Sequence, residues 1–256
     1  RAIHELRAAY RNGAKAVLFV LPTGGGKTVV FCYITRTALQ RPGGQVLILV
    51  HRRELVNQAS KQLTAMGIDH GVIASGTKMT KSDVQVASVQ TLVRRIDNLN
   101  FYPSLIIIDE AHHAVAGTWA KILNAPQNKK AKLLGVTATP MRLDGKGLDD
   151  FFDAMVKGPS IKELTDMGHL TQAKYFSIPP RFNRKEIAHA NGDFLMSSAA
   201  KKLTKNNAHG DALREYEKRC PGKPAIVFCC NVEHSKLCAE MFNKAGYRAA
   251  HLDGAT

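Results

Sequence analysis

Residues 22–28, Pro-Thr-Gly-Gly-Gly-Lys-Thr, join three glycines to a lysine and a hydroxyl side chain. In such a loop the glycines let backbone N–H groups turn inward around a phosphate chain, the lysine reaches the terminal phosphates and the hydroxyl binds Mg²⁺. An apolar run of strand type precedes the loop, and an apolar helical pattern starts at Thr28. The sequence therefore predicts a nucleoside triphosphate site with Mg²⁺ on the Thr28 hydroxyl, formed by Thr23, Gly24, Gly25, Gly26, Lys27 and Thr28.

One residue departs from the strict pattern of this loop. The strict pattern has a glycine six residues before the lysine, where this chain has Leu21. The alternative interpretation is a glycine-rich turn that only joins a strand to a helix. The Lys-Thr pair in register favours the phosphate-binding loop.

Two adjacent carboxylates form the second group that could do chemistry. Asp109 and Glu110 follow the apolar run Leu105–Ile108, so a buried strand would deliver them to its carboxyl end, where ligands of α/β proteins bind. In ATPases with a phosphate-binding loop, the first carboxylate holds Mg²⁺ and the second orients and deprotonates the attacking water. We expect these roles for Asp109 and Glu110, and a catalytic set completed by Lys27. A polar strand end that caps the next helix is the alternative.

The elements that must position these residues alternate between strand and helix. Short apolar runs separated by helical patterns indicate a parallel sheet covered on both faces. The predicted strands are 16–21, 46–50, 84–88, 105–108 and 133–137, with 68–73 as a further candidate. The predicted helices between them are 28–39, 53–66, 91–98 and 118–123.

A second alternating unit follows a region with weaker signals. We predict a short helix capped by Ser160, with Glu163 three residues on, and a strand over 172–178. The last part of the chain predicts helices over 211–219 and 233–244 and strands over 224–229 and 247–252. The expected domains are 1–150, a connecting region 151–207, and the start of a second domain at 208–256.

The charge of the chain is strongly basic, with 36 Lys and Arg against 21 Asp and Glu. Residues 1–140 hold 18 basic and 7 acidic side chains, a net charge of +11. This excess predicts a polyanionic partner in addition to a nucleotide, although a basic surface without a partner is the alternative. The sequence has neither an apolar run of membrane-spanning length nor the pattern of a signal peptide.

The five cysteines include no Cys-x-x-Cys pair. A zinc site of the usual spacing needs two such short pairs, so we expect buried free thiols in a reducing cytosol. His112 and His113 are adjacent, but no cysteine lies near them in the sequence and we expect no metal site there beyond Mg²⁺.

Six segments in order carry a family resemblance. Asp109-Glu110-Ala111-His112 and the phosphate-binding loop are similar to motifs II and I of the superfamily 2 helicases of DEAD/DEAH-box type. The residues around 139–148 resemble most closely the XPB-like and RadD-like DNA helicases of bacteria and phages. The other segments resemble motifs Ia (50–58), Ib (87–92), III (137–140) and IV (225–231).

The resemblance implies a first RecA-like lobe followed by a truncated second one, and an ATP-dependent motor that moves along nucleic acid. His112, Thr137 and Thr139 would couple the state of the nucleotide to the nucleic acid. Contacts to its backbone, insensitive to base sequence, would come from Arg52, Arg53, Ser88 and Thr91. We expect DNA rather than RNA as the partner, and a cytoplasmic, nucleoid-associated location in a bacterium or phage-infected cell.

Two departures from the family's pattern limit this inference. The family's adenine-reading glutamine would precede Arg1, and motifs V and VI, with their arginine finger, would follow Thr256. The chain therefore has the pattern of a fragment. A double-strand translocase that does not separate strands remains open, as does a module that binds ATP and DNA without efficient turnover.

Overall fold

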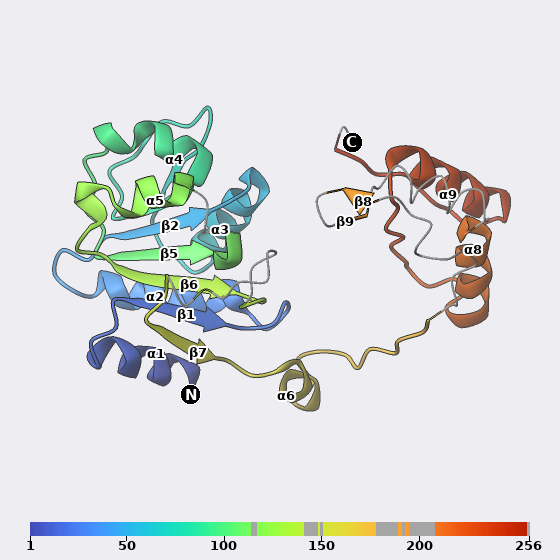
Figure 1. Ribbon diagram of the computed structural model, residues 1–256, viewed down its shortest axis with the longest axis horizontal. Helices are drawn as coiled ribbons and strands as arrows, with labels where there is room; N and C mark the ends of the chain where they lie inside the picture. Colours follow the sequence, from blue (N-terminus) through green and yellow to red (C-terminus); the bar gives the residue numbers. More distant parts are fainter. Residues whose placement is uncertain are drawn as a thin grey trace. The chain divides into compact units, whose positions relative to one another are not determined.

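The computed structural model describes residues 1–113, 117–140, 148, 151–177, 189–190, 193–194 and 208–254. The chain divides into two compact units, Arg1–Ala173 and Lys174–Thr256, which are described separately (Figure 1).

A seven-stranded, wholly parallel sheet forms the centre of the first unit. The strands lie in the order β3-β4-β2-β5-β6-β1-β7 across the sheet. Their bounds are β1 Ala16–Val20, β2 Val46–Val50, β3 Gly71–Ile73, β4 Val84–Ser88, β5 Leu105–Asp109, β6 Lys132–Thr137 and β7 Ala154–Lys157.

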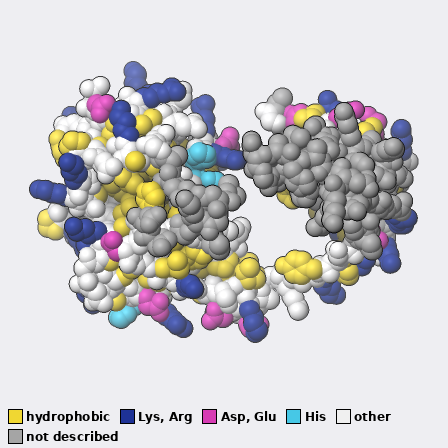
Figure 2. All heavy atoms as spheres, viewed as in Figure 1, with side chains coloured by type: hydrophobic (Ala, Val, Ile, Leu, Met, Phe, Trp, Pro, Cys, Tyr) yellow, Lys and Arg dark blue, Asp and Glu magenta, His cyan; other side chains and the backbone are white. Residues whose placement is uncertain are grey.

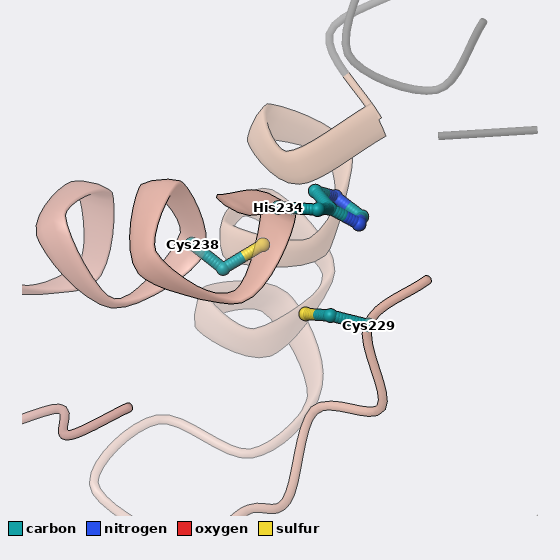
Figure 3. A group of neighbouring side chains, drawn as sticks. All are labelled: Cys229, His234 and Cys238. Carbon is teal, nitrogen blue, oxygen red and sulfur yellow. The ribbon is translucent and has the colours of Figure 1, made fainter. Parts of the chain in front are cut away.

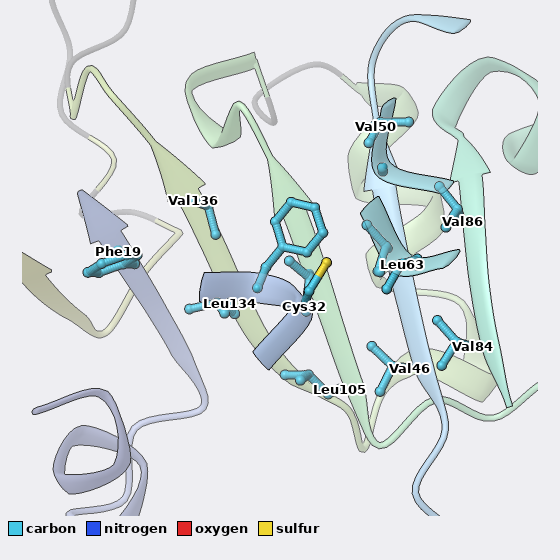
Figure 4. Packing of buried hydrophobic residues seen from close by; sticks show 14 of the residues in the cluster. Phe19, Cys32, Val46, Val50, Leu63, Val84, Val86, Leu105, Leu134 and Val136 are labelled. Atoms are coloured by element: carbon cyan, nitrogen blue, oxygen red, sulfur yellow. The ribbon is translucent and has the colours of Figure 1, made fainter. Parts of the chain in front are cut away.

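Helices cover both faces of this sheet. Side chains from α1 (Ala2–Arg11), α2 (Lys27–Leu39) and α3 (Arg53–Ala65) form one core cluster with alternate strand residues (Figure 4). The other strand residues pack against α4 (Val89–Arg95) and α5 (Gly117–Leu123). Short 3₁₀ helices lie at η1 Ile96–Asn98, η2 Ala111–His113 and η3 Pro126–Asn128. Because both faces of the central strands are covered, all five residues of β2 are buried, which explains its uninterrupted apolar sequence.

The predicted α/β fold of the first unit is confirmed, and its strands and helices begin and end within about three residues of their expected positions. One α-helix and one strand were missed, α1 and β7, as were the short 3₁₀ helices η2 and η3. The strand β7 is only four residues long and pairs with β1, so it belongs to the first sheet. The first unit consequently extends to Ala173, beyond the domain end predicted at residue 150.

After β7, helix α6 (Ile161–Asp166) begins where the capping pattern predicted it. The Glu163 backbone N–H donates to Ser160 Oγ, and the Ser160 backbone N–H donates to Glu163 Oε2. The strand expected over 172–178 is wrong, because residues 172–177 make no strand pairing; Ile178 lies outside the described residues.

The second unit contains helices α8 (Ala208–Arg219) and α9 (Val232–Lys244) and the two-residue strands β8 (His189–Ala190) and β9 (Asp193–Phe194). Tyr216 of α8 contacts Phe242 of α9 with a ring separation of 5.5 Å. The strands predicted over 224–229 and 247–252 are wrong, because both segments are extended without a partner strand in the described part of the chain. Several of their apolar side chains are exposed, and Phe228 is 92% exposed.

Candidate functional site

The carboxyl ends of the parallel strands bring most of the predicted site residues to one edge of the sheet. The phosphate-binding loop follows β1, Thr137 ends β6 and Asp109 ends β5. Because β6 lies between β1 and β5, the loop and the acidic pair face one another across a single strand. Further along the same edge, β2 leads into Arg52 and Arg53, and β4 ends at Ser88.

The loop after β1 has the geometry that a phosphate chain requires. Gly24 and Gly26 have φ of 79° and 88°, in the left-handed region that favours glycine. Gly26 is the N-cap of α2, and no side chain caps the helix. The first turn also has no acidic residue. The first backbone N–H groups of α2 are thus available to an anion at the positive end of the helix dipole, so the loop fits a phosphate group.

Leu21 stands where the strict pattern has glycine, and the structure explains this difference. Its side chain is 2% exposed and packs against two glycines. A Cβ on Gly25 would lie 2.9 Å from Leu21 Cγ, and a Cβ on Gly158 would lie 2.6 Å from Leu21 Cδ1. Leu21 is therefore a core residue that anchors the base of the loop.

Residues beyond β7 also support this loop, which the sequence did not indicate. A Cβ on Gly24 would lie 2.9 Å from Leu170 Cδ2, and one on Gly25 would lie 3.2 Å from Leu164 Cδ1. The segment that carries α6 thus packs directly against the glycines. The predicted connecting region, 151–207, includes these residues.

Asp109 and Glu110 form a compact acidic pair. The Glu110 backbone N–H donates to Asp109 Oδ1 at 3.0 Å. Burial, followed by the charge of Glu110, raises the pKa of Asp109, while the backbone hydrogen bond and the charge of Lys27 act in the opposite direction. The charge of Lys27 thus favours the ionised form of Asp109.

Glu110 has an unusual backbone conformation. Its φ is +50°, and it is the only residue other than glycine with a positive φ among those that the structure describes. A positive φ costs a residue with a Cβ on the order of 1 kcal/mol or more, and such strain concentrates at functional sites. The turn directs the chain from β5 into η2, which carries His112 and His113.

Thr137 connects the acidic pair to the loop through several hydrogen bonds. The Leu21 backbone N–H donates to the Thr137 carbonyl at 2.9 Å. The buried Thr137 hydroxyl donates to the Thr139 carbonyl at 2.9 Å and accepts from the Thr139 N–H at 3.1 Å. It also lies 2.9 Å from His112 Nδ1, within hydrogen-bonding distance.

His112 therefore links β6 to the acidic pair. Its Nδ1 also lies 3.4 Å from Glu110 Oε2. The three predicted coupling residues, His112, Thr137 and Thr139, thus form one hydrogen-bonded group.

Two further histidines extend this group toward β2. The rings of His112 and His113 lie 4.1 Å apart, and His113 stacks on His51 at 5.1 Å with an interplanar angle of 25°. Partial burial and neighbouring cationic groups, with Arg52 among them, lower the pKa of His51 and of His113. Sequence reasoning gave His113 no role and missed His51; its position directly after β2, beside Arg52, was the available signal.

The four predicted nucleic-acid contacts differ in their exposure. Arg52 and Arg53 are exposed at the start of α3, and Arg52 is an N-cap without a side-chain hydrogen bond to the helix. Thr91 is half-buried, whereas Ser88 is only 7% exposed. The arginines are therefore the more accessible pair. On the face shown in Figure 2, Lys and Arg side chains are spread over the first unit and acidic side chains are sparse.

None of the helices in the described ranges is both long and apolar enough to cross a membrane. Of the five cysteines, which are all free thiols, Cys32 and Cys238 are buried and the other three are half-buried. The expectation of buried thiols thus holds for two of the five.

Comparisons with known proteins point to one family. The family model described as "Type III restriction enzyme, res subunit" matches residues 1–142. The chain is 34% identical over 235 residues to a 51.5 kDa protein of a Lactococcus phage (isolate 7-9), covering 92% of this chain and 48% of that protein. It is 31% identical over 273 residues to the putative ATP-dependent helicase IRC3 of Saccharomyces cerevisiae, covering 100% of this chain and 40% of that protein.

A solved DEAD box protein from Methanococcus jannaschii superposes with a TM-score of 0.50 at 19% identity, covering 97% of this chain and 64% of that one. This similarity concerns the fold alone. The chain spans about half the length, or less, of the two curated relatives.

Proposed function

Because the chain belongs to the family of the type III restriction enzyme res subunit and to the superfamily 2 helicases, we propose that it is the ATP-hydrolysing part of a motor that moves along DNA. The observation that carries the proposal is the single sheet edge shared by an uncapped helix N-terminus, an acidic pair and two exposed arginines. An anion-binding loop and a carboxylate pair are what phosphoryl transfer to water requires.

Each residue of the edge has a proposed role. The backbone of 23–28 and the Lys27 ammonium bind the phosphates, and Thr28 and Asp109 hold Mg²⁺. Bound ATP supplies the phosphoryl group that is transferred. Glu110 orients the attacking water and accepts its proton, and its carboxylate lies 3.4 Å from His112 Nδ1 at the strained turn after Asp109.

The hydrogen-bonded group around Thr137 is the proposed coupling element. It joins the base of the phosphate loop, through the Leu21 N–H, to His112 and the acidic pair. The ring of His113 stacks on the ring of His51, and His51 directly precedes Arg52 in the chain. A change in the nucleotide site can thus reach the arginines through contiguous contacts.

Nucleotide binding provides the first test. We expect Lys27→Ala to weaken ATP·Mg²⁺ binding to the 256-residue chain at least about tenfold, because a charge-assisted phosphate contact contributes about 1.5–3 kcal/mol. Lys61→Ala, which changes an exposed lysine of α3, is the matched control. Equal affinity of wild-type protein and Lys27→Ala in equilibrium titrations would contradict the proposed site.

Nucleic-acid binding provides the second test. The logarithm of the association constant falls linearly with the logarithm of the salt concentration. Each phosphate contact makes this negative slope steeper, by about 0.7 for single strands and about 0.9 for duplex DNA. If both arginines contact phosphates, Arg52→Ala with Arg53→Ala makes the slope shallower by about 1.4–1.8. Lys129→Ala with Lys130→Ala is the control, because these exposed lysines lie before β6 at the opposite edge. Equal slopes for the two double variants refute the proposed contact.

A duplex translocase that does not separate strands is the second candidate, and the restriction-enzyme family description favours it. Strand-displacement and triplex-displacement assays on the full-length protein distinguish it from a helicase. DNA displaced from a triplex without strand separation supports the translocase. Competition between single-stranded DNA and RNA tests the preference for DNA.

A further inference from the structure

Three side chains of the second unit that could ligate a metal lie close together, far in sequence from the ATP site. Cys229, His234 and Cys238 each offer one ligand atom, and these atoms all lie within 4.8 Å of one another. Figure 3 shows the two sulfur atoms directed toward each other from opposite sides, with the imidazole beside them. His234 and Cys238 are buried, and Cys229 is half-buried.

The start of α9 creates this arrangement. Asn231 is the N-cap of the helix, and its side chain accepts a hydrogen bond from the His234 N–H at 2.8 Å. His234 and Cys238 are four residues apart on α9, so their side chains share one helix face. Cys229 approaches that face from the extended segment before the cap.

We propose that Cys229, His234 and Cys238 form a binding site for a thiophilic divalent cation of the zinc type, with a fourth ligand from solvent. Two thiolates and an imidazole are the donors that zinc prefers, and two thiolates balance its charge. Zinc–sulfur bonds of about 2.3 Å in a tetrahedron place two sulfurs about 3.8 Å apart. The three side chains therefore need to close by no more than about 1 Å from the observed 4.8 Å limit to bind the ion.

A cavity beside the cluster gives room for the fourth ligand. It has a volume of about 310 Å³, and both Cys229 and Cys238 line it. The described residues that line it include Lys223 and Arg248 but no carboxylate. Water or hydroxide is therefore the expected fourth ligand.

Binding must release protons from the two thiols. The ion displaces one proton from each cysteine to solvent, while neutral His234 donates a ring-nitrogen lone pair. No redox change occurs, and the affinity rises with pH because fewer protons must be displaced.

This site differs from the sequence-based expectation of free thiols. The spacing is Cys-x₄-His-x₃-Cys, without a Cys-x-x-Cys pair, and only the helical turn between His234 and Cys238 makes the two adjacent. A bound ion would tie the extended segment 224–230 to α9 in a unit whose predicted strands are absent from the described residues. The proposal is thus independent of the motor function.

The test compares zinc binding by variants of the 256-residue chain. Chelator-treated, reduced protein is titrated with zinc chloride and, separately, with cobalt(II), whose thiolate charge-transfer absorption reports sulfur ligation. We expect one ion per chain and an affinity at least about tenfold lower in Cys229→Ser, His234→Ala and Cys238→Ser. The matched control is Cys230→Ser, which changes the adjacent half-buried cysteine outside the cluster.

Cys229→Ser is the decisive variant, because Cys229 is half-buried and its replacement leaves α9 intact. Circular dichroism checks the fold of the two buried-site variants. No stoichiometric zinc binding by the wild-type chain would overturn the proposal. So would cobalt spectra without thiolate bands, or a loss of affinity in Cys230→Ser as large as in Cys229→Ser.

Discussion

Replacing Thr137 by valine removes one hydroxyl and tests whether the hydrogen bonds around it couple the ATP site to the nucleic acid. Valine has nearly the same shape as threonine, so the buried packing at the end of β6 is kept. Three hydrogen bonds of Thr137 Oγ1 are lost, those to His112 Nδ1 and to the Thr139 N–H and carbonyl. The backbone bond from Leu21 to the Thr137 carbonyl remains.

The size of the effect follows from these contacts. A hydrogen bond contributes about 0.5–1.5 kcal/mol net, and the exposed Thr139 can bond to water instead, so we expect a loss of about 1–3 kcal/mol in unfolding free energy. His112 keeps its 3.4 Å contact with Glu110 Oε2 and its ring contact with His113. A loss of about 1 kcal/mol in holding His112 corresponds to about a fivefold change in the population of its coupled position.

The assay measures ATP affinity and the stimulation of ATP hydrolysis by DNA in the full-length protein. We expect Thr137→Val to leave ATP affinity within about threefold of wild type and to lower the stimulated rate about fivefold. Thr137→Ser, which keeps the hydroxyl, is the control. A double-mutant cycle with His112→Ala should give a coupling energy of about 1 kcal/mol. Equal stimulation of Thr137→Val and Thr137→Ser, or a coupling energy of zero, would refute the reasoning.

Two further predictions concern the ends of β5 and β1. Asp109 has a higher pKa in the folded protein than in the unfolded chain, where it is about 4. The contribution of Asp109 to folding stability is therefore fully present below about pH 4, and it is lost as the pH rises through the pKa of Asp109 in the folded protein. At neutral pH without metal, Asp109→Asn should therefore raise the urea concentration at the midpoint of unfolding, and this increase should vanish below about pH 4. A lower midpoint of the variant at pH 7 contradicts this prediction. Gly25→Ala places a Cβ 2.9 Å from Leu21 Cγ and 3.0 Å from the Pro22 carbonyl, so the loop must shift and ATP should bind at least about tenfold more weakly. Gly117→Ala is its control, since a Cβ there meets nothing within 4 Å, and equal ATP affinities would speak against the close packing of the loop.

The first unit could be predicted from sequence where local pattern and tertiary environment agree. The runs 46–50 and 84–88 became β2 and β4 with the predicted bounds. Strands buried on both faces favour apolar sequence, which is continuous in β2 and interrupted by the buried Gln85 in β4. The glycines and the Lys-Thr pair likewise indicated the loop, since φ values near +80° at Gly24 and Gly26 need glycine.

The predictions failed where a partner element decides the structure. The segment 224–229 has the composition of a buried strand, yet without a neighbouring strand in the described part of the chain it leaves Ile226 82% exposed. Conversely, β7 is too short to stand out in the sequence and forms because β1 offers it a free edge. Strand formation depends on pairing, which a local pattern does not contain.

The same dependence on partner elements explains which residues of the candidate site could be predicted from the sequence. Lys27, Asp109 and Glu110 belong to contiguous motifs, whereas His51 is recognisable only through its stack on His113, 62 residues away along the chain. The support of the phosphate loop by Leu164 and Leu170 depends in the same way on how the chain returns after β7. These contacts pass from the loop through Thr137 and the imidazoles to Arg52, across strands β1, β6, β5 and β2 in that spatial order. The order of the strands thus provides a physical route between the two proposed binding surfaces, and Thr137 is the point at which a single hydroxyl can interrupt it.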